Sequence, residues 1–166
     1  RNLGPADDRA GGAPRLEQLD LTLVEGAHAQ VGHVGHRGDR MLGVEDADAL
    51  ADRVRAAIPL TTHLDFRFTA FDGERLTLTA PLAPNHNNKG TFFAGSQSAL
   101  LTLAGWGLTT LLAQQSGHPA DVVAVETSLE YKLPLDGDLQ ITASISEEDR
   151  ERFAQRLSRR GKATLH

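Results

Sequence analysis

The stretch "NHNNKGTFFAGSQSALLTLAGWGLTTLLAQQSGHPA", residues 85–120, decides the fold of this chain. After Lys89 it contains no Asp, Glu, Lys or Arg until Asp121, although 23% of the whole chain is charged. A helix of about twenty apolar residues could span a bilayer. However, serine, glutamine, threonine and glycine residues interrupt this run, and half-polar alternating segments flank it. The pattern therefore favours a helix over 94–113 that is buried in a protein core.

The segments before this helix predict a short helix and a hairpin. Residues 45–58 place acidic residues first and apolar residues at helical spacing, and Pro59 stops the helix. Residues 63–71 and 74–82 alternate apolar and polar side chains, and the "DG" between them is a strong hairpin turn. These two runs predict an antiparallel pair with one buried face.

The segments after the helix complete the pattern. Residues 121–135 predict a long strand and residues 139–146 a second one. Residues 147–162 predict a helix with acids first, bases last and Gly161 at its end, and residues 163–166 begin another strand. This order predicts an α+β fold in which an antiparallel sheet wraps around one long helix.

The first forty residues differ from the rest. Residues 1–40 hold seven glycines, three histidines and no aromatic residue, so they bury little to offset the entropy of ordering. We expect 1–40 to be a weakly ordered extension or a non-native start, and 41–166 to form one domain. His28, His33 and His36 lack the carboxylate or Cys partners of a zinc site, so we expect polar loop histidines and no bound metal.

Composition argues against several classes of protein. The formal net charge of −5 gives no broad basic field for a nucleic acid. The chain has no cysteine, which excludes disulfide and thiolate chemistry, and it shows no secretory signal pattern. We therefore expect a cytoplasmic protein without a cofactor, a nucleic-acid partner or a membrane partner.

Two motifs carry a resemblance to a known family. "APN-x-N-x-K-G-T-x-F-x-G-S" at 83–96 and "AGWG" at 104–107 resemble the signature of the YiiD C-terminal-type thioesterase family, and the resemblance extends over 45–166. It implies the hotdog fold, a curved antiparallel sheet around the central helix, and pairing of two units as a homodimer or a dimer of dimers. It also implies hydrolysis of an acyl thioester of coenzyme A or an acyl-carrier protein. Family members continue past the position of His166, so we expect the last strands to be missing here.

The residues around the start of the central helix suit this chemistry. Thioester hydrolysis needs an oxyanion site, an activated water and a slot for the acyl chain. Gly90 and Gly95 flank the expected helix start, where free N–H groups and the helix dipole favour negative charge. We predict that N–H groups near Ala94 and Gly95 hold the carbonyl oxygen. Alternatively, these glycines only shape a loop and a tight helix–sheet contact.

The loop pattern "N-x-x-G-T-x-x-x-G" is similar to that of the phenylacetate-pathway type of hotdog thioesterase. The similarity implies that Asn87 binds water or the thioester carbonyl, although an Asx-turn role is the alternative. Phe93 stands where that type has a histidine and Thr102 where it has a catalytic Asp, so its carboxylate mechanism cannot be carried over. The predicted substrate-binding residues are Gly90, Phe93, Ala94 and Ser96.

The general base is less well defined. Glu126 and Glu130 follow on the next predicted strand, and we take Glu126 as the candidate, although a solvated strand face explains both. Ser96 is not in a G-x-S-x-G elbow, so we expect it to cap the helix or contact the substrate. We expect direct attack by a water that Asn87 positions. A non-catalytic acyl-binding module and a hotdog dehydratase remain the alternatives.

The last predicted helix ends in a group of basic residues. They could bind the phosphates of coenzyme A or of an acyl-carrier protein. Alternatively, they only interact with the negative end of the helix dipole, and we favour this second interpretation. These residues are Arg156, Arg159, Arg160 and Lys162.

Overall fold

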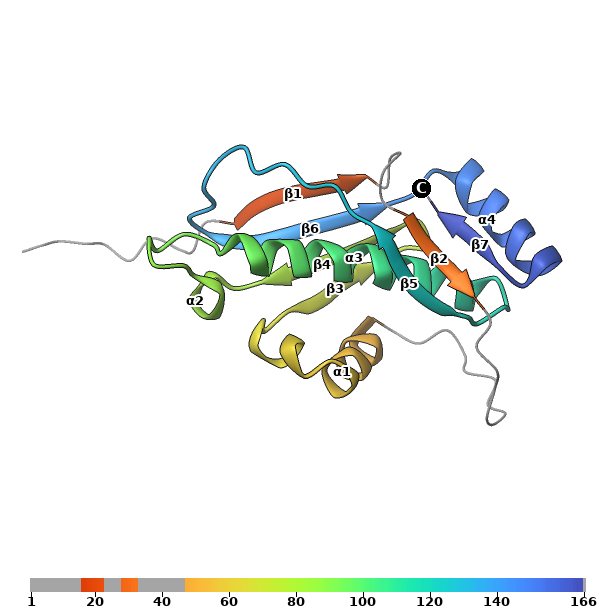
Figure 1. Ribbon diagram of the computed structural model, residues 1–166, viewed down its shortest axis with the longest axis horizontal. Coiled ribbons are helices and arrows are strands. Elements are labelled where there is room, and N and C mark those ends of the chain that lie inside the picture. Colours follow the sequence, from red (N-terminus) through yellow and green to blue (C-terminus); the bar gives the residue numbers. More distant parts are fainter. Residues whose placement is uncertain (1–15, 23–27, 33–46, 166) are drawn as a thin grey trace, which may run out of the picture.

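The computed structural model describes residues 16–22, 28–32 and 47–165 (Figure 1). The strands are β1 (Leu16–Thr22), β2 (His28–Gly32), β3 (Arg67–Phe71), β4 (Arg75–Ala80), β5 (Asp121–Glu126), β6 (Asp138–Ser144) and β7 (Ala163–Leu165). The helices are α1 (Ala47–Ala57), the 3-10 helix η1 (Pro59–His63), α2 (Leu82–Asn85), α3 (Ala94–Gln115) and α4 (Glu147–Arg160).

Two sheets pack around α3. The first has the strand order β1-β6-β4-β3, with β4 antiparallel to both of its neighbours and β1 parallel to β6. The second has the order β5-β2-β7, with β2 antiparallel to both neighbours. Figure 1 shows α3 running along these strands, with α1 beside β3 and α4 at the opposite end from α2. The predicted α+β fold, an antiparallel sheet against one long helix, is confirmed.

The helix α3 is buried around most of its C-terminal half, as the uncharged sequence predicts. The buried hydroxyls of Thr109 and Thr110 donate to the carbonyls four residues earlier, over 2.9 and 2.8 Å, so the helix itself satisfies them. The indole N–H of Trp106 donates to the carbonyl of Val122 (2.9 Å) and ties α3 to β5. Among the described residues, no helix combines the length and the apolar character that crossing a bilayer requires.

The strand predicted for 121–135 is shorter than expected. β5 ends at Glu126, and residues 127–137 form no regular element. In the part of the chain that the structure describes, the pairing of β5 with β2 ends at Glu126 and His28, the first residue of β2. Beyond that pair, alternating side chains alone cannot supply the backbone hydrogen bonds that a strand needs.

The structure places β1 and β2 within 1–40, where we expected a weakly ordered extension. β1 forms backbone hydrogen bonds with β6, and β2 forms them with β5 and β7. The content of apolar residues in a segment does not reveal such backbone pairing. The rest of 1–40, including His33 and His36, lies outside the described residues. The domain boundary at Met41 stays a prediction.

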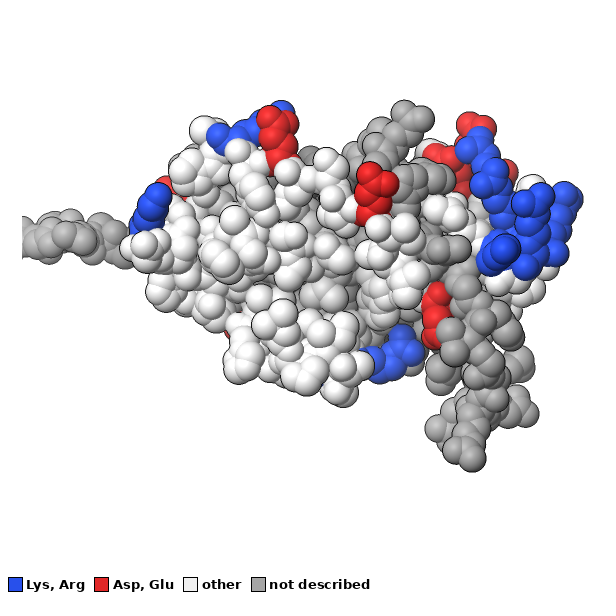
Figure 2. All heavy atoms as spheres, viewed as in Figure 1, with Lys and Arg blue, Asp and Glu red and all other residues white. Residues whose placement is uncertain are grey.

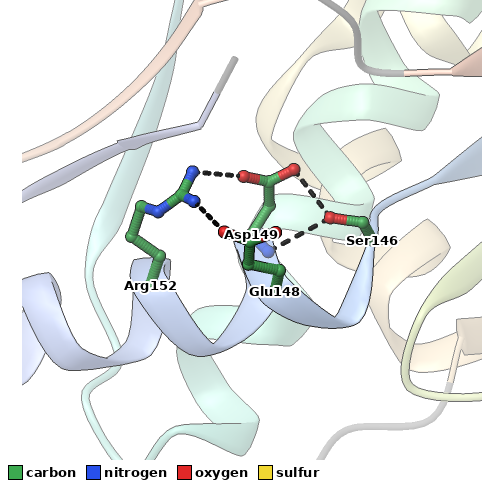
Figure 3. A network of polar contacts seen from close by, with 4 residues as sticks. All are labelled: Ser146, Glu148, Asp149 and Arg152. Carbon is green, nitrogen blue, oxygen red and sulfur yellow. Dashed lines mark hydrogen bonds and ion pairs between the residues drawn. The ribbon is translucent and has the colours of Figure 1, made fainter.

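Local signals set the predicted turn and the last helix. In the β3–β4 turn, Asp72 accepts hydrogen bonds from the N–H groups of Glu74 (2.9 Å) and Arg75 (2.7 Å). These bonds to the backbone lower the pKa of the Asp72 carboxyl from its ordinary value. Ser146 caps α4 by accepting from the N–H of Asp149, and Gly161 ends the helix at a φ of 64° (Figure 3).

Candidate active site

The loop before α3 is anchored at a buried asparagine. Asn85 is 1% exposed, and its Nδ2 donates to the carbonyls of Leu64 (2.9 Å) and Pro81 (2.8 Å). Its own backbone carbonyl accepts from the N–H of Phe93 (2.7 Å), across the base of the loop. Asn85 therefore anchors the first residue of the loop 85–93 through its side chain and the last residue through its backbone carbonyl.

Asn87 organises the interior of this loop. Its Oδ1 accepts from the N–H groups of Lys89 (2.8 Å) and Thr91 (3.3 Å), and its Nδ2 donates to the Thr91 hydroxyl (2.9 Å). Gly90, at the exposed tip, has a φ of 77°, which glycine adopts without strain. The side chain of Asn87 thus forms the Asx turn that was the alternative, and its role toward water or a carbonyl stays a prediction.

The start of α3 carries no side-chain cap. Phe93 is the N-cap residue, so the expectation that Ser96 caps the helix is wrong; Ser96 lies in the first turn, half-buried. The N–H of Gln97 donates to the carbonyl of Phe93 (3.0 Å) as the first regular helical bond. In the part of the chain that the structure describes, the three preceding N–H groups, from Ala94, Gly95 and Ser96, have no acceptor.

Phe93 lies against this first turn. Its side chain is 52% exposed, and a Cβ built on Gly95 would come within 2.4 Å of a ring carbon. Glycine at position 95 is therefore what allows the ring to lie on the backbone here. Phe93 and Gly95, both predicted site residues, are in direct contact.

A second aromatic residue reaches the same turn from the loop after β5. The hydroxyl of Tyr131 donates to the carbonyl of Ala94 (2.8 Å), and the carbonyl of Leu135 accepts from the N–H of Phe92 (2.7 Å). The segment 127–135 therefore passes over the start of α3. The sequence analysis did not single out Tyr131, because nothing local indicates a contact that spans 37 residues.

Gln97 was also missed as a site residue. It is 8% exposed, and its Nε2 donates to the carbonyl of Phe92 (3.1 Å), the residue before the N-cap. The sequence does not single it out, because Gln97 stands between Ser96 and Ser98 in the same uncharged run.

Glu126, the predicted base, is exposed at the last position of β5. The hydrogen bonds of Asn87 in the described part of the chain stay within its own loop, so the structure does not join these two predicted catalytic residues. Within the described ranges, no group of three or more His, Cys, Asp or Glu residues is arranged to hold a metal ion.

The basic end of α4 lies far from this site. Figure 2 shows blue side chains gathered at the end of the molecule opposite the loop 85–93. With 22 residues, α3 is about 33 Å long, at 1.5 Å per residue, and separates the two. This separation favours the interpretation of Arg159 and Arg160 in which they interact with the negative end of the α4 dipole. They lie too far away to bind a ligand at the start of α3 in the same chain.

The fold and the loop together define a hotdog protein of the thioesterase-like class. The family model described as "Putative thioesterase (yiiD_Cterm)" matches residues 47–166, and the chain belongs to this family.

Solved structures agree with this assignment. A protein of unknown function from Chlorobaculum tepidum is 28% identical, with a TM-score of 0.65 over 69% of this chain and 71% of its own. A putative thioesterase from Shewanella oneidensis is 26% identical, with a TM-score of 0.59 over 64% and 77%. A probable thioesterase from Pseudomonas aeruginosa, at 22% identity and a TM-score of 0.55 over 68% and 75%, shows the shared fold alone.

Proposed function

We propose that this protein hydrolyses an acyl thioester of coenzyme A or of an acyl-carrier protein by direct attack of water. One observation carries the proposal: the start of α3 is uncapped and presents first-turn N–H groups at an exposed glycine. A developing oxyanion is stabilised by such preorganised donors and by the positive end of the helix dipole. The membership of the chain in a thioesterase family supports this chemistry.

The residues at the helix start take distinct roles in the proposal. The N–H groups of Ala94 and Gly95 bind the thioester oxygen, and Gly90 and Ser96 line the approach. Phe93, half-exposed against the first turn, contacts the acyl or pantetheine part of the substrate. Asn87 holds the loop in the shape that this approach requires. Glu126 is the candidate base.

We further propose that two copies pair along β5. This strand is the edge of its sheet, and Val123 and Val125 on it are 55% and 59% exposed. Tyr131 and Leu133 continue the exposed apolar surface on the loop that follows. Figure 2 shows few charged side chains over the middle of the face that carries α3 and β5. Exposed apolar side chains on a strand at the edge of the described sheet suit a second copy of the chain.

The test is thiol release from a panel of acyl-CoA and acyl-carrier-protein thioesters of different chain length. Turnover by the wild-type protein is expected to fall about 10²–10³-fold in Gly95→Val, because a side chain there overlaps the Phe93 ring and displaces it across the first-turn N–H groups. Asn87→Ala should lower turnover by loosening the loop, and Glu126→Gln tests the base while keeping the shape. Melting curves of each variant control for folding. Absence of release from every thioester would refute the proposal.

A non-catalytic acyl-binding module is the second candidate. It is favoured by the kinds of group in contact at the start of α3. The hydrogen bonds there join amides, a phenol and backbone groups, and none of these is a carboxylate or a histidine that could act as a base. A non-hydrolysable acyl-CoA analogue that binds by calorimetry, with no turnover of the matching thioester, would establish this alternative. A dehydratase, which needs a histidine or acid at this position, finds no support in Phe93 and Thr102.

A further inference from the structure

We propose that Gln97 positions the attacking water at the start of α3. This inference rests on the proposed thioesterase function and names a residue that the proposed mechanism lacked. Asn87 cannot easily supply the acceptor for water, because its Oδ1 already accepts two N–H groups of its own loop. A different acceptor near the first turn is therefore required.

Gln97 is a polar residue in a position where polarity is costly. It is more than nine-tenths buried, one turn into a helix whose buried neighbours are largely apolar. Burying an amide without hydrogen-bond partners is costly, so a buried glutamine calls for a partner on each side of its amide. One side has such a partner, since Nε2 donates to the carbonyl of Phe92.

This hydrogen bond from Nε2 to Phe92 also fixes the position of the amide oxygen, Oε1. A carbonyl can only accept, so Nε2 must be the atom that faces Phe92, and the amide cannot be flipped. Phe92 precedes the N-cap, so the side chain folds back toward the start of α3. Oε1 shares a carbon with Nε2 and lies at this same end. Within the described residues it is neither hydrogen-bonded nor fully enclosed, so it can accept a hydrogen bond from water.

Two other buried amides show that this arrangement is specific to Gln97. Oδ1 of Asn85 and Oε1 of Gln114 also lack a partner, but both atoms are fully enclosed. Gln114 lies at the other end of α3, where carbonyl groups, not N–H groups, are left free. Of these three amides, only Gln97 has an acceptor that is not fully enclosed and lies on the first turn of α3.

The chemical step follows from this placement. Oε1 accepts a hydrogen bond from a water whose oxygen then bonds to the thioester carbon. The carbonyl electron pair moves to the oxygen held by the N–H groups of Ala94 and Gly95. When this pair returns, the carbon–sulfur bond breaks and the thiolate leaves. The proton lost by the water is taken by the proposed base, Glu126, and then passes through solvent to the thiolate, so water and thioester give a carboxylic acid and a thiol. Gln97 orients the water and takes no proton.

The experiment compares variants for thiol release from the best acyl-CoA, with melting curves and the affinity for a non-hydrolysable analogue. Gln97→Met keeps the size and removes the acceptor; we expect kcat to fall about 10²-fold with KM nearly unchanged. Gln97→Glu restores an acceptor that can also take a proton. In a Glu126→Gln background, its kcat should therefore rise with pH through a carboxyl pKa, a step that Glu126→Gln alone should lack. Gln114→Met, the matched control in the same helix, should keep the wild-type kcat.

The outcomes separate this inference from the proposed function. Two results would overturn the role of Gln97 and leave the function standing, provided that the wild type turns over the substrate. One is full kcat in Gln97→Met, and the other is the absence of a pH-dependent step in a folded and active Gln97→Glu/Glu126→Gln variant. A wild-type protein that binds the analogue but releases no thiol overturns the function itself. A decrease in kcat that is equal in Gln114→Met would show only a structural effect and would also overturn the role.

Discussion

At the scale of single residues, Gly107 sets the distance between α3 and the sheet. A Cβ at this position would come within 2.9 Å of the Leu76 side chain and 3.0 Å of the Phe68 ring. Replacing glycine by alanine in a helix gains up to about 1 kcal/mol, but overpacking a core costs about 1–3 kcal/mol. We expect Gly107→Ala to lower the free energy of unfolding by about 1 kcal/mol and Gly107→Val by more, measured by urea unfolding. A more stable Gly107→Ala would show that helix propensity outweighs the contact.

Asp72 gives a prediction for the dependence of stability on pH. Its pKa is lowered in the fold by hydrogen bonds from the N–H groups of Glu74 and Arg75. A group with a lowered pKa stabilises the fold above its unfolded pKa and loses that contribution as the pH falls through the folded pKa. The melting temperature of Asp72→Ala should therefore lie below that of the wild type at neutral pH, and the difference should shrink as the pH falls below 3.8, the ordinary pKa of Asp. A difference that does not change with pH would contradict this.

At the scale of elements, α4 has a capping residue at each end, Ser146 at its start and Gly161 after its last turn. Arg152 bonds to Glu148 and Asp149 in its first turns, while Ser146 caps the helix (Figure 3). Loss of a serine cap typically costs about 1 kcal/mol. We expect Ser146→Ala to lower the free energy of unfolding by this amount, measured in urea. Ser158→Ala, an exposed control in the same helix, should change it by less than about 0.5 kcal/mol; equal effects would remove the cap as the cause.

The elements that could be predicted from the sequence are those with local signals. A short sequence pattern indicates each of three features: the turn at Asp72, the end of α4 at Gly161 and the uncharged helix α3. The end of β5 could not be predicted, because its last residue pairs with the first residue of β2, about a hundred residues earlier in the chain. The contact of Tyr131 with Ala94 could not be predicted either, since it forms only when the loop after β5 returns to the start of α3. The motif located the loop of the candidate site, but its hydrogen bonds required the fold.

At the scale of the molecule, the two ends of α3 differ in chemistry. At its start, an anchored loop, two aromatic side chains and a buried amide surround unpaired N–H groups. At its other end, α4 directs its bases outward, away from the loop (Figure 2). The asymmetry concentrates the groups suited to an oxyanion at one end, and β5, with its exposed valines, runs along the helix between them.

The proposed pairing along β5 gives a prediction for the whole molecule. Val125 is 59% exposed on this edge strand, and burying it against a second copy would stabilise a dimer. A lysine there would place a charge in an apolar contact and block edge pairing, as charged residues do on natural edge strands. By sedimentation we expect the wild type to be a dimer and Val125→Lys a monomer. Thr69→Lys, at an exposed position of β3, an edge strand of the other sheet, should remain a dimer. A monomeric wild type, or a dimer that survives Val125→Lys, would rule out pairing through β5.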